Sequence, residues 1–232
     1  MANDSTPATR TVPAQELRAL SLHIAHETRH HLAAVCDYAE CLGWAGAQQP
    51  LARDRCARAI LAETQRVGRL LGYFMALAGQ RDQSPPMALD LEDVLFGACA
   101  ELADLLALHG STLETSRLGL RCSVEWPPGL LKQVAVAALD TMVASTAEGA
   151  AIRLRVAPNS ADSVALALTT SADAVAARLP RLLSYRAMAL LLTERGGQVR
   201  RLRGREDGMV LLIPVDGRQV VIESEQAAQR AG

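Results

Sequence analysis

Aromatic side chains are scarce in this 232-residue sequence, at 3% of residues, although half of all residues are hydrophobic. The core is therefore expected to consist of Leu, Val and Ala, which favours packed helices. Neither sign of charge is in excess, because 24 basic residues stand against 25 acidic ones. Nothing in this balance indicates a general affinity for nucleic acid or for anionic membranes.

Cysteine and long apolar runs are also in short supply. The cysteines are odd in number and have no C-x-x-C spacing: Cys36, Cys41, Cys56, Cys99 and Cys122. This pattern argues against a disulfide framework or a zinc knuckle and favours free thiols in a reducing compartment. The N-terminus has no apolar signal core, and no segment reaches the roughly 18 apolar residues of a membrane span. We therefore expect a cytoplasmic protein with no membrane segment.

The first third of the chain has a helical pattern. Residues 1–13 are polar and predict a disordered arm. Residues 14–80 predict two long helices, 14–42 and 51–78, because apolar residues recur at helical spacing in both. Two such helices with a short loop form an antiparallel hairpin, which buries its apolar faces fully only when two hairpins associate into a four-helix bundle. We therefore expect a homodimer.

A linker-like segment, 81–87, precedes a region in which helical and strand patterns alternate. Helices are expected at 91–109, 129–147 and 182–195, and strands at 118–126, 151–157, 163–170, 198–204 and 209–215. Residues 88–216 therefore predict an α+β sandwich with helices on one face of a mixed sheet. The remaining 217–232 form a tail in which the segment QVVIES is a candidate strand.

Two motifs overlap in residues 25–32, AHETRHHL. His26, Glu27 and His30 form His-Glu-x-x-His, the zinc protease pattern in which two histidines hold the metal and the glutamate is the general base. A third ligand at the usual downstream spacing does not follow, and the charged Arg29 stands between the two histidines. A zinc protease is therefore a minor alternative, and no metal site is expected.

The same letters, His-Glu-x-Arg followed by an aliphatic run, resemble the phosphoacceptor helix of bacterial histidine kinases, which usually has Ser-His-Glu-Leu-Arg-Thr-Pro-Leu. The order of the expected elements is similar as well, since that family joins a dimerisation and phosphotransfer hairpin to an ATP-binding domain. The resemblance implies that His26 is the phosphoacceptor and that Glu27 assists it. At about 100° per residue, His26 lies opposite the apolar stripe of its helix. It is therefore expected to be exposed, as a nucleophile that attacks a partner's acyl phosphate must be.

The nucleotide-binding motifs of that family are replaced in this sequence. Ala137 and Thr141 stand where the family has two asparagines, 170–172 replace an Asp-x-Gly turn, and 182–185 replace a Gly-x-Gly loop. Only about ten residues remain for the lid that covers ATP in the family. Glycines let backbone amides approach phosphates, and an asparagine holds magnesium, so the ATP site is expected to be lost. No cofactor is expected apart from magnesium brought by a partner.

A phosphoacceptor hairpin with a degenerate ATP-binding domain resembles bacterial histidine phosphotransferases built on the kinase scaffold. These take a phosphoryl group from the aspartate of one receiver domain, such as that of a hybrid histidine kinase, and pass it to another response regulator. The residues expected to contact the receiver are Arg29, His30, Ala34, Asp37, Arg58, Gln65 and Arg69.

Two other functions remain open on the sequence. The chain could be a kinase-like scaffold that binds or sequesters a response regulator or a kinase without transferring phosphate. It could also be an unusual active histidine kinase. No nucleic acid or membrane is expected as a partner in any of these.

Overall fold

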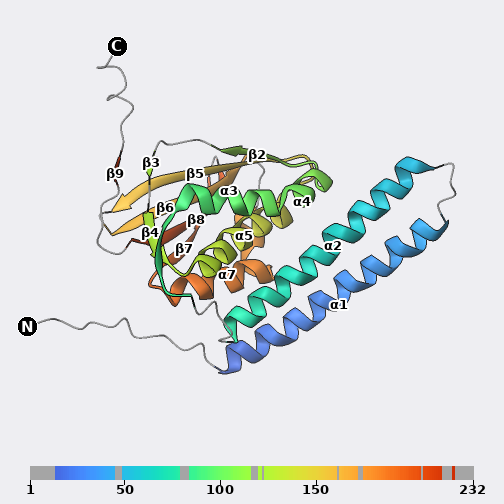
Figure 1. Cartoon of the computed structure of the whole chain (residues 1–232), viewed down its shortest axis with the longest axis horizontal. Helices are drawn as coiled ribbons and strands as arrows, with labels where there is room; N and C mark the ends of the chain where they lie inside the picture. Colours follow the sequence, from blue (N-terminus) through green and yellow to red (C-terminus); the bar gives the residue numbers. More distant parts are fainter. Residues whose placement is uncertain are drawn as a thin grey trace, which may run out of the picture.

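The computed structural model describes residues 14–44, 49–78, 84–115, 120–121, 123–160, 162–171, 175–204, 206–215 and 221–222. They form a helical hairpin and an α+β sandwich, as expected from the sequence (Figure 1). The arm at 1–13, residues 79–83 and all of the tail from 217 except 221–222 lie outside the described residues.

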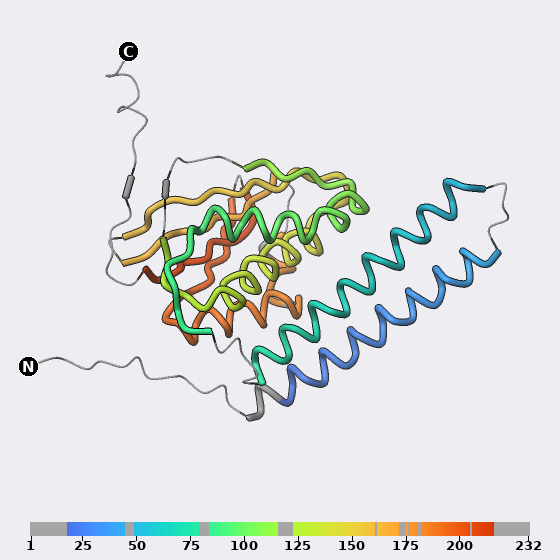
Figure 2. The backbone as a smooth tube through the Cα atoms, in the orientation of Figure 1, coloured from blue at the N-terminus to red at the C-terminus, as the bar shows by residue number. Residues whose placement is uncertain are grey.

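The hairpin consists of α1 (Ala14–Trp44) and α2 (Pro50–Leu77), which pack against each other along their length. Pro50 stands at the start of α2, where its fixed φ suits a helix and its missing N–H is not needed. The loop end of the hairpin extends beyond the sandwich, while the other end of α2 lies against it (Figure 2). Within the described ranges, no helix is long and apolar enough to cross a membrane.

The sandwich has a mixed five-stranded sheet in the order β2-β5-β6-β8-β7. The strands β2 and β5 are parallel and the other neighbours are antiparallel. The elements are β1 (Met87–Asp90), α3 (Leu91–Glu101), α4 (Ala103–Leu108), β2 (Thr112–Thr115), β3 (Leu120–Arg121), β4 (Ser123–Trp126), α5 (Pro128–Ser145), β5 (Ala151–Ser160), β6 (Ser163–Thr170), α6 (Val175–Arg178), the 3-10 helix η1 (Leu179–Arg181), α7 (Leu183–Thr193), β7 (Gln198–Leu202), β8 (Asp207–Pro214) and β9 (Val221–Ile222).

Several boundaries differ from the sequence-based expectation. The helix expected over 91–109 is divided into α3 and α4 at Leu102, whose φ of -101° and ψ of 5° are not helical. The strand expected over 118–126 is represented by two short strands, β3 and β4, which belong to separate two-stranded pairs, β3 with β9 and β1 with β4. The alternating pattern runs through both short strands, but each pairs with a partner distant in sequence, which the pattern does not specify.

One face of the sheet is covered by α3, α5 and α7, which also pack on one another (Figure 1). The middle helix, α5, is buried along almost its whole length. Residues of α2, among them Leu70, Tyr73 and Leu77, belong to the same apolar cluster as the α5 and α7 side chains. The hairpin and the sandwich therefore share one core, in which α2 packs against the outer side of the helical layer.

Candidate functional site

His26 lies on α1 and is exposed. The opposite side of the helix carries Leu20 and Ile24, which are buried against α2 and the sandwich. Because His26 follows Ile24 by two positions, it points roughly 200° away from that residue around the helix. His30, one turn further along, lies on the same side as His26 and is also exposed. The imidazole of His26 is therefore open to a partner from solvent.

Glu27 belongs to a row of ionisable side chains on the next side of α1. Its carboxylate oxygens lie 3.7 Å from Nε2 of His23 and 3.8 Å from Nε2 of His31. The other ring nitrogen of His31, Nδ1, donates a hydrogen bond of 2.6 Å to Glu63 on α2. This hydrogen bond lowers the pKa of the Glu63 carboxyl, against the opposing effect of its partial burial. The row thus ties α1 to α2 beside His26, while the adjacent positions of His26 and Glu27 aim their side chains apart.

The residues expected to contact a receiver have different environments. Arg29, His30 and Asp37 are exposed on α1, and Ala34 is half-buried there. On α2, Arg58 is exposed and pairs with Asp54 at 2.5 Å. Gln65 is half-buried.

Arg69 departs from the expectation. It is only 7% exposed, and its Nη2 lies 3.4 Å from Oδ1 of Asp140 on α5. This burial argues against direct contact between Arg69 and a receiver, because the sandwich covers that side of α2.

Three of the residues expected to replace nucleotide motifs, Ala137, Thr141 and Ser184, lie together in the helical layer. Ala137 and Thr141 are fully buried on α5. The Thr141 hydroxyl lies 2.6 Å from the carbonyl oxygen of Ala137 and 2.7 Å from the hydroxyl of Ser184, near the start of α7. The polar atoms at two of these positions therefore bond to each other.

Metal-ligating side chains do not gather at the His-Glu-x-x-His motif. Across the part of the chain that the structure describes, no group of three or more His, Cys, Asp or Glu side chains is placed to hold a metal ion. His26 and His30 are one helical turn apart, as expected, but both face solvent.

A cavity between the hairpin and the sandwich, with several charged and polar side chains in its wall, was not expected from the sequence. It is lined by Arg69 and Tyr73 of α2 and by Lys132 of α5, among others. Two signals in the sequence stand out afterwards: Lys132 is the single lysine in the chain, and Gly68 and Gly72 are four residues apart within a helix. Neither feature indicates a ligand on its own, because only the tertiary structure brings Lys132 close to α2.

Comparison with known proteins shows a histidine-kinase-like scaffold. The histidine kinase AdeS of Acinetobacter baumannii is similar in structure, with a TM-score of 0.57 and 12% identity, over 82% of this chain and 98% of that one. A bacterial phosphotransferase is similar with a TM-score of 0.51 and 15% identity, over 88% of this chain and 98% of that one. No family model matches the sequence, and the search of curated proteins found no match. At these identities the likeness concerns the fold alone.

Proposed function

We propose that this protein is a histidine phosphotransferase that relays a phosphoryl group between receiver domains through His26, without using ATP. The observation that carries the proposal is the exposed imidazole of His26 on the hairpin of a histidine-kinase-like scaffold. A free imidazole is the usual nucleophile for this chemistry near neutral pH.

The chemistry balances without a nucleotide. A nitrogen of the His26 imidazole attacks the phosphorus of an aspartyl phosphate on the first receiver, forming an N–P bond while the P–O bond to the aspartate breaks. The aspartate leaves as a carboxylate. In the second transfer, the aspartate carboxylate of another receiver attacks the phosphorus of the phosphohistidine. A P–O bond forms while the N–P bond breaks, and the imidazole leaves. Magnesium and acidic side chains supplied by the receivers neutralise the charge of the transferring group.

The buried contact between α5 and α7 supports the part of the proposal that excludes ATP. Magnesium and phosphates need oxygen ligands, backbone amides and space. The methyl side chain of Ala137 offers no ligand, and the Thr141 hydroxyl is engaged with Ser184. Neither side chain is therefore placed to hold magnesium, which supports a function that does not use ATP.

Glu27 is proposed to act on His26 indirectly. Its carboxylate lies in the row formed with His23 and His31, which places a negative charge on the side of α1 next to that of His26. Replacing Glu27 by Gln removes the charge with little change in shape. If the charge assists His26, phosphoryl transfer should be slower in this variant and the dependence of its rate on pH should shift. An unchanged dependence of the rate on pH would mean that Glu27 only stabilises the hairpin.

We also propose that two copies associate through the hairpin. A groove of about 450 Å³ on one side of it is lined largely by apolar atoms of both helices, including Leu32, Leu71 and Phe74. Leu32 is 49% and Leu71 48% exposed in a single chain. A second hairpin packed into this groove would complete a four-helix bundle and leave His26, on another side of α1, open.

The experiment is a transfer assay with radiolabelled phosphate. Wild-type protein, His26→Ala and His30→Ala are mixed either with ATP or with a panel of phosphorylated receiver domains. We expect acid-labile label only in mixtures with a receiver, lost in His26→Ala and retained at a lower rate in His30→Ala, because His30 is expected to contact the receiver but not to accept the phosphoryl group.

Each other result refutes the proposal in a distinct way. Label acquired from ATP alone would make the protein an active kinase. Tight receiver binding without label from any receiver would make it a sequestering scaffold. Label that persists in His26→Ala would move the phosphoacceptor to another residue.

A further inference from the structure

We propose that the cavity between α2, α3 and α5 binds a small phosphate-class anion through Arg69, Tyr73 and Lys132. Its volume is about 310 Å³, enough for a small solute. One wall comes from α2 of the hairpin, and the others come from Glu101 of α3 and from the first turns of α5. The proposal does not depend on the role of His26.

Two buried donors in the cavity wall lack acceptors. Tyr73 is 1% exposed, and Arg69 pairs with Asp140 through Nη2. Among the described residues, the Tyr73 hydroxyl and Arg69 Nε have no hydrogen-bond partner. Native proteins rarely leave such groups unsatisfied, because burial without a partner costs free energy. A guanidinium N–H can only donate, so the missing partner must be an acceptor.

The phenol of Tyr73 is held in its donor form. Burial, aided by the charges of Asp140 and Glu101, raises its pKa well above the ordinary value of 10.0, although Arg69 opposes the effect. The hydroxyl therefore keeps its proton at any physiological pH. An anionic oxygen is the acceptor that gains most from two such donors, because charge-assisted hydrogen bonds are the stronger ones.

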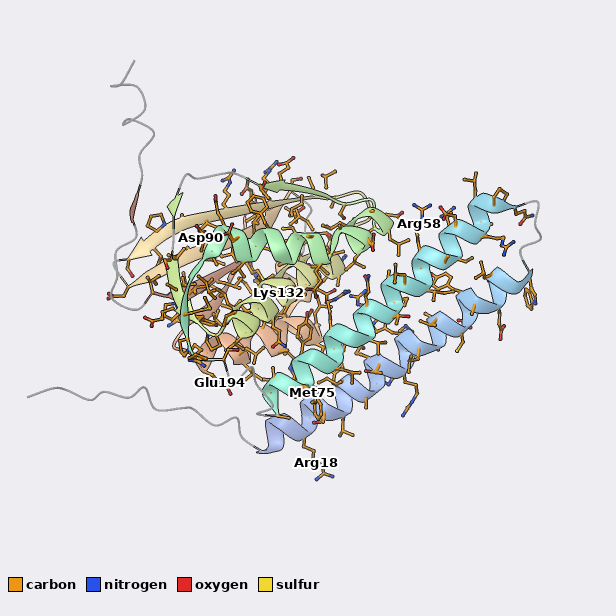
Figure 3. The ribbon with its side chains drawn as sticks, in the orientation of Figure 1. Arg18, Arg58, Met75, Asp90, Lys132 and Glu194 are labelled. Atoms are coloured by element: carbon orange, nitrogen blue, oxygen red, sulfur yellow. The ribbon has the colours of Figure 1, made fainter. Side chains whose placement is uncertain are left out.

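The electrostatics of the cavity also favour an anion. Gly129 and Lys132, in the first turns of α5, line it from the side, at the end of the helix where the dipole is positive. Lys132 lies on α5 between the sandwich helices and α2 (Figure 3). Its ammonium is 2.8 Å from Glu101, and its side chain is half exposed, which leaves it free to turn toward a ligand.

The charges of Arg69 and Lys132 are matched by those of Asp140 and Glu101, so the two unpartnered donors, and not a net charge, would select the anion. The donors approach from different elements, α2 on one side and α5 on the other. A tetrahedral phosphate accepts hydrogen bonds in all directions, whereas a carboxylate accepts them mainly in its own plane. This arrangement favours phosphate over a carboxylate.

Two glycines of α2 leave the space open. A Cβ at Gly68 would meet nothing within 4 Å, and one at Gly72 would meet only Nε2 of Gln133 at 4.0 Å. Close packing therefore requires neither glycine, and both φ values lie outside the left-handed region. Glycine is less favourable than alanine within a helix. The absence of side chains at these two positions leaves volume free in the cavity.

The single lysine makes a direct test possible. The protein is treated with a limiting amine-acylating reagent, and the acylation rate of Lys132 is followed by peptide mass spectrometry, with the α-amino group as internal reference. Inorganic phosphate, pyrophosphate and citrate are titrated separately at constant ionic strength. At a concentration about ten times the dissociation constant, phosphate or pyrophosphate should slow acylation of Lys132 about tenfold and leave the reference unchanged.

Three variants separate this cavity from any other anion site. In Gly72→Leu, which fills the space, protection of Lys132 should vanish, and in Tyr73→Phe, which removes one donor, it should weaken. In Gly97→Leu, a matched change at an open position of α3, protection should remain as in the wild type. The proposal is overturned if neither phosphate nor pyrophosphate protects the wild type, if citrate alone protects it, or if protection survives in folded Gly72→Leu.

Discussion

The buried ion pair between Arg69 and Asp140 should be one of the most sensitive points of the structure. The two side chains are only 6% and 3% exposed, and they join the hairpin to the middle helix of the sandwich. Replacing Asp140 by Ala leaves the Arg69 guanidinium in a buried position without its carboxylate. Such an orphaned charge costs about 3–5 kcal/mol, a large part of the roughly 5–15 kcal/mol by which a domain is stable.

The distance within the pair indicates where that cost arises. At 3.4 Å, the contact between Nη2 and Oδ1 is longer than a strong charge-assisted hydrogen bond. Most of the loss should therefore come from desolvating the remaining charge, not from the broken bond. The double variant Arg69→Met with Asp140→Leu removes both charges and should recover most of the stability.

The free energy of unfolding is measured by urea titration, with the fluorescence of Trp126 as the signal, because this side chain is buried in the sandwich. The matched control is Glu101→Ala, which breaks the exposed pair with Lys132 and should cost no more than about 1 kcal/mol. The reasoning is refuted if Asp140→Ala is no more destabilising than this control, or if the double variant loses as much stability as Arg69→Met and Asp140→Leu lose separately when their losses are added.

Three further predictions concern the hairpin and the sheet. The pKa of Glu63 is lowered by its hydrogen bond from His31, so its contribution to stability is complete above its ordinary pKa of 4.5 and is lost as the pH falls through the lowered value. Thermal unfolding should show Glu63→Gln to be less stable than the wild type near neutral pH, by roughly 1 kcal/mol, and the difference should disappear in acid. Gly208→Ala should destabilise the sheet by at least about 2 kcal/mol in chemical denaturation, because the new Cβ would overlap the carbonyl oxygen of Leu168. Leu71→Glu should halve the mass measured by light scattering, since a charge would enter the groove proposed to bind a second copy; an unchanged mass would place the dimer contact elsewhere.

The long helices were predictable because their signal is local. The apolar residues of α1 and α2 repeat at helical spacing, and the expected ranges 14–42 and 51–78 differ from the observed bounds by at most two residues. The edge strand β2 was missed because it is only four residues long. Three of these residues are exposed, so buried and exposed positions do not alternate clearly. The place of β2 beside β5 depends on a parallel pairing with a segment far along the chain.

The sequence by itself determined the hairpin, the mixed sandwich and the position of His26 opposite an apolar stripe, because each of these follows from residue identity and local periodicity. Only the tertiary structure decided what covers the other sides of α2. Periodicity places Arg69 off the stripe that faces α1, which made it a candidate for the open surface. The sandwich covers that side of α2, and it brings Asp140 and Lys132 to Arg69 and Tyr73. Docking of this kind depends on the shapes and charges of segments distant in sequence, which no local pattern specifies.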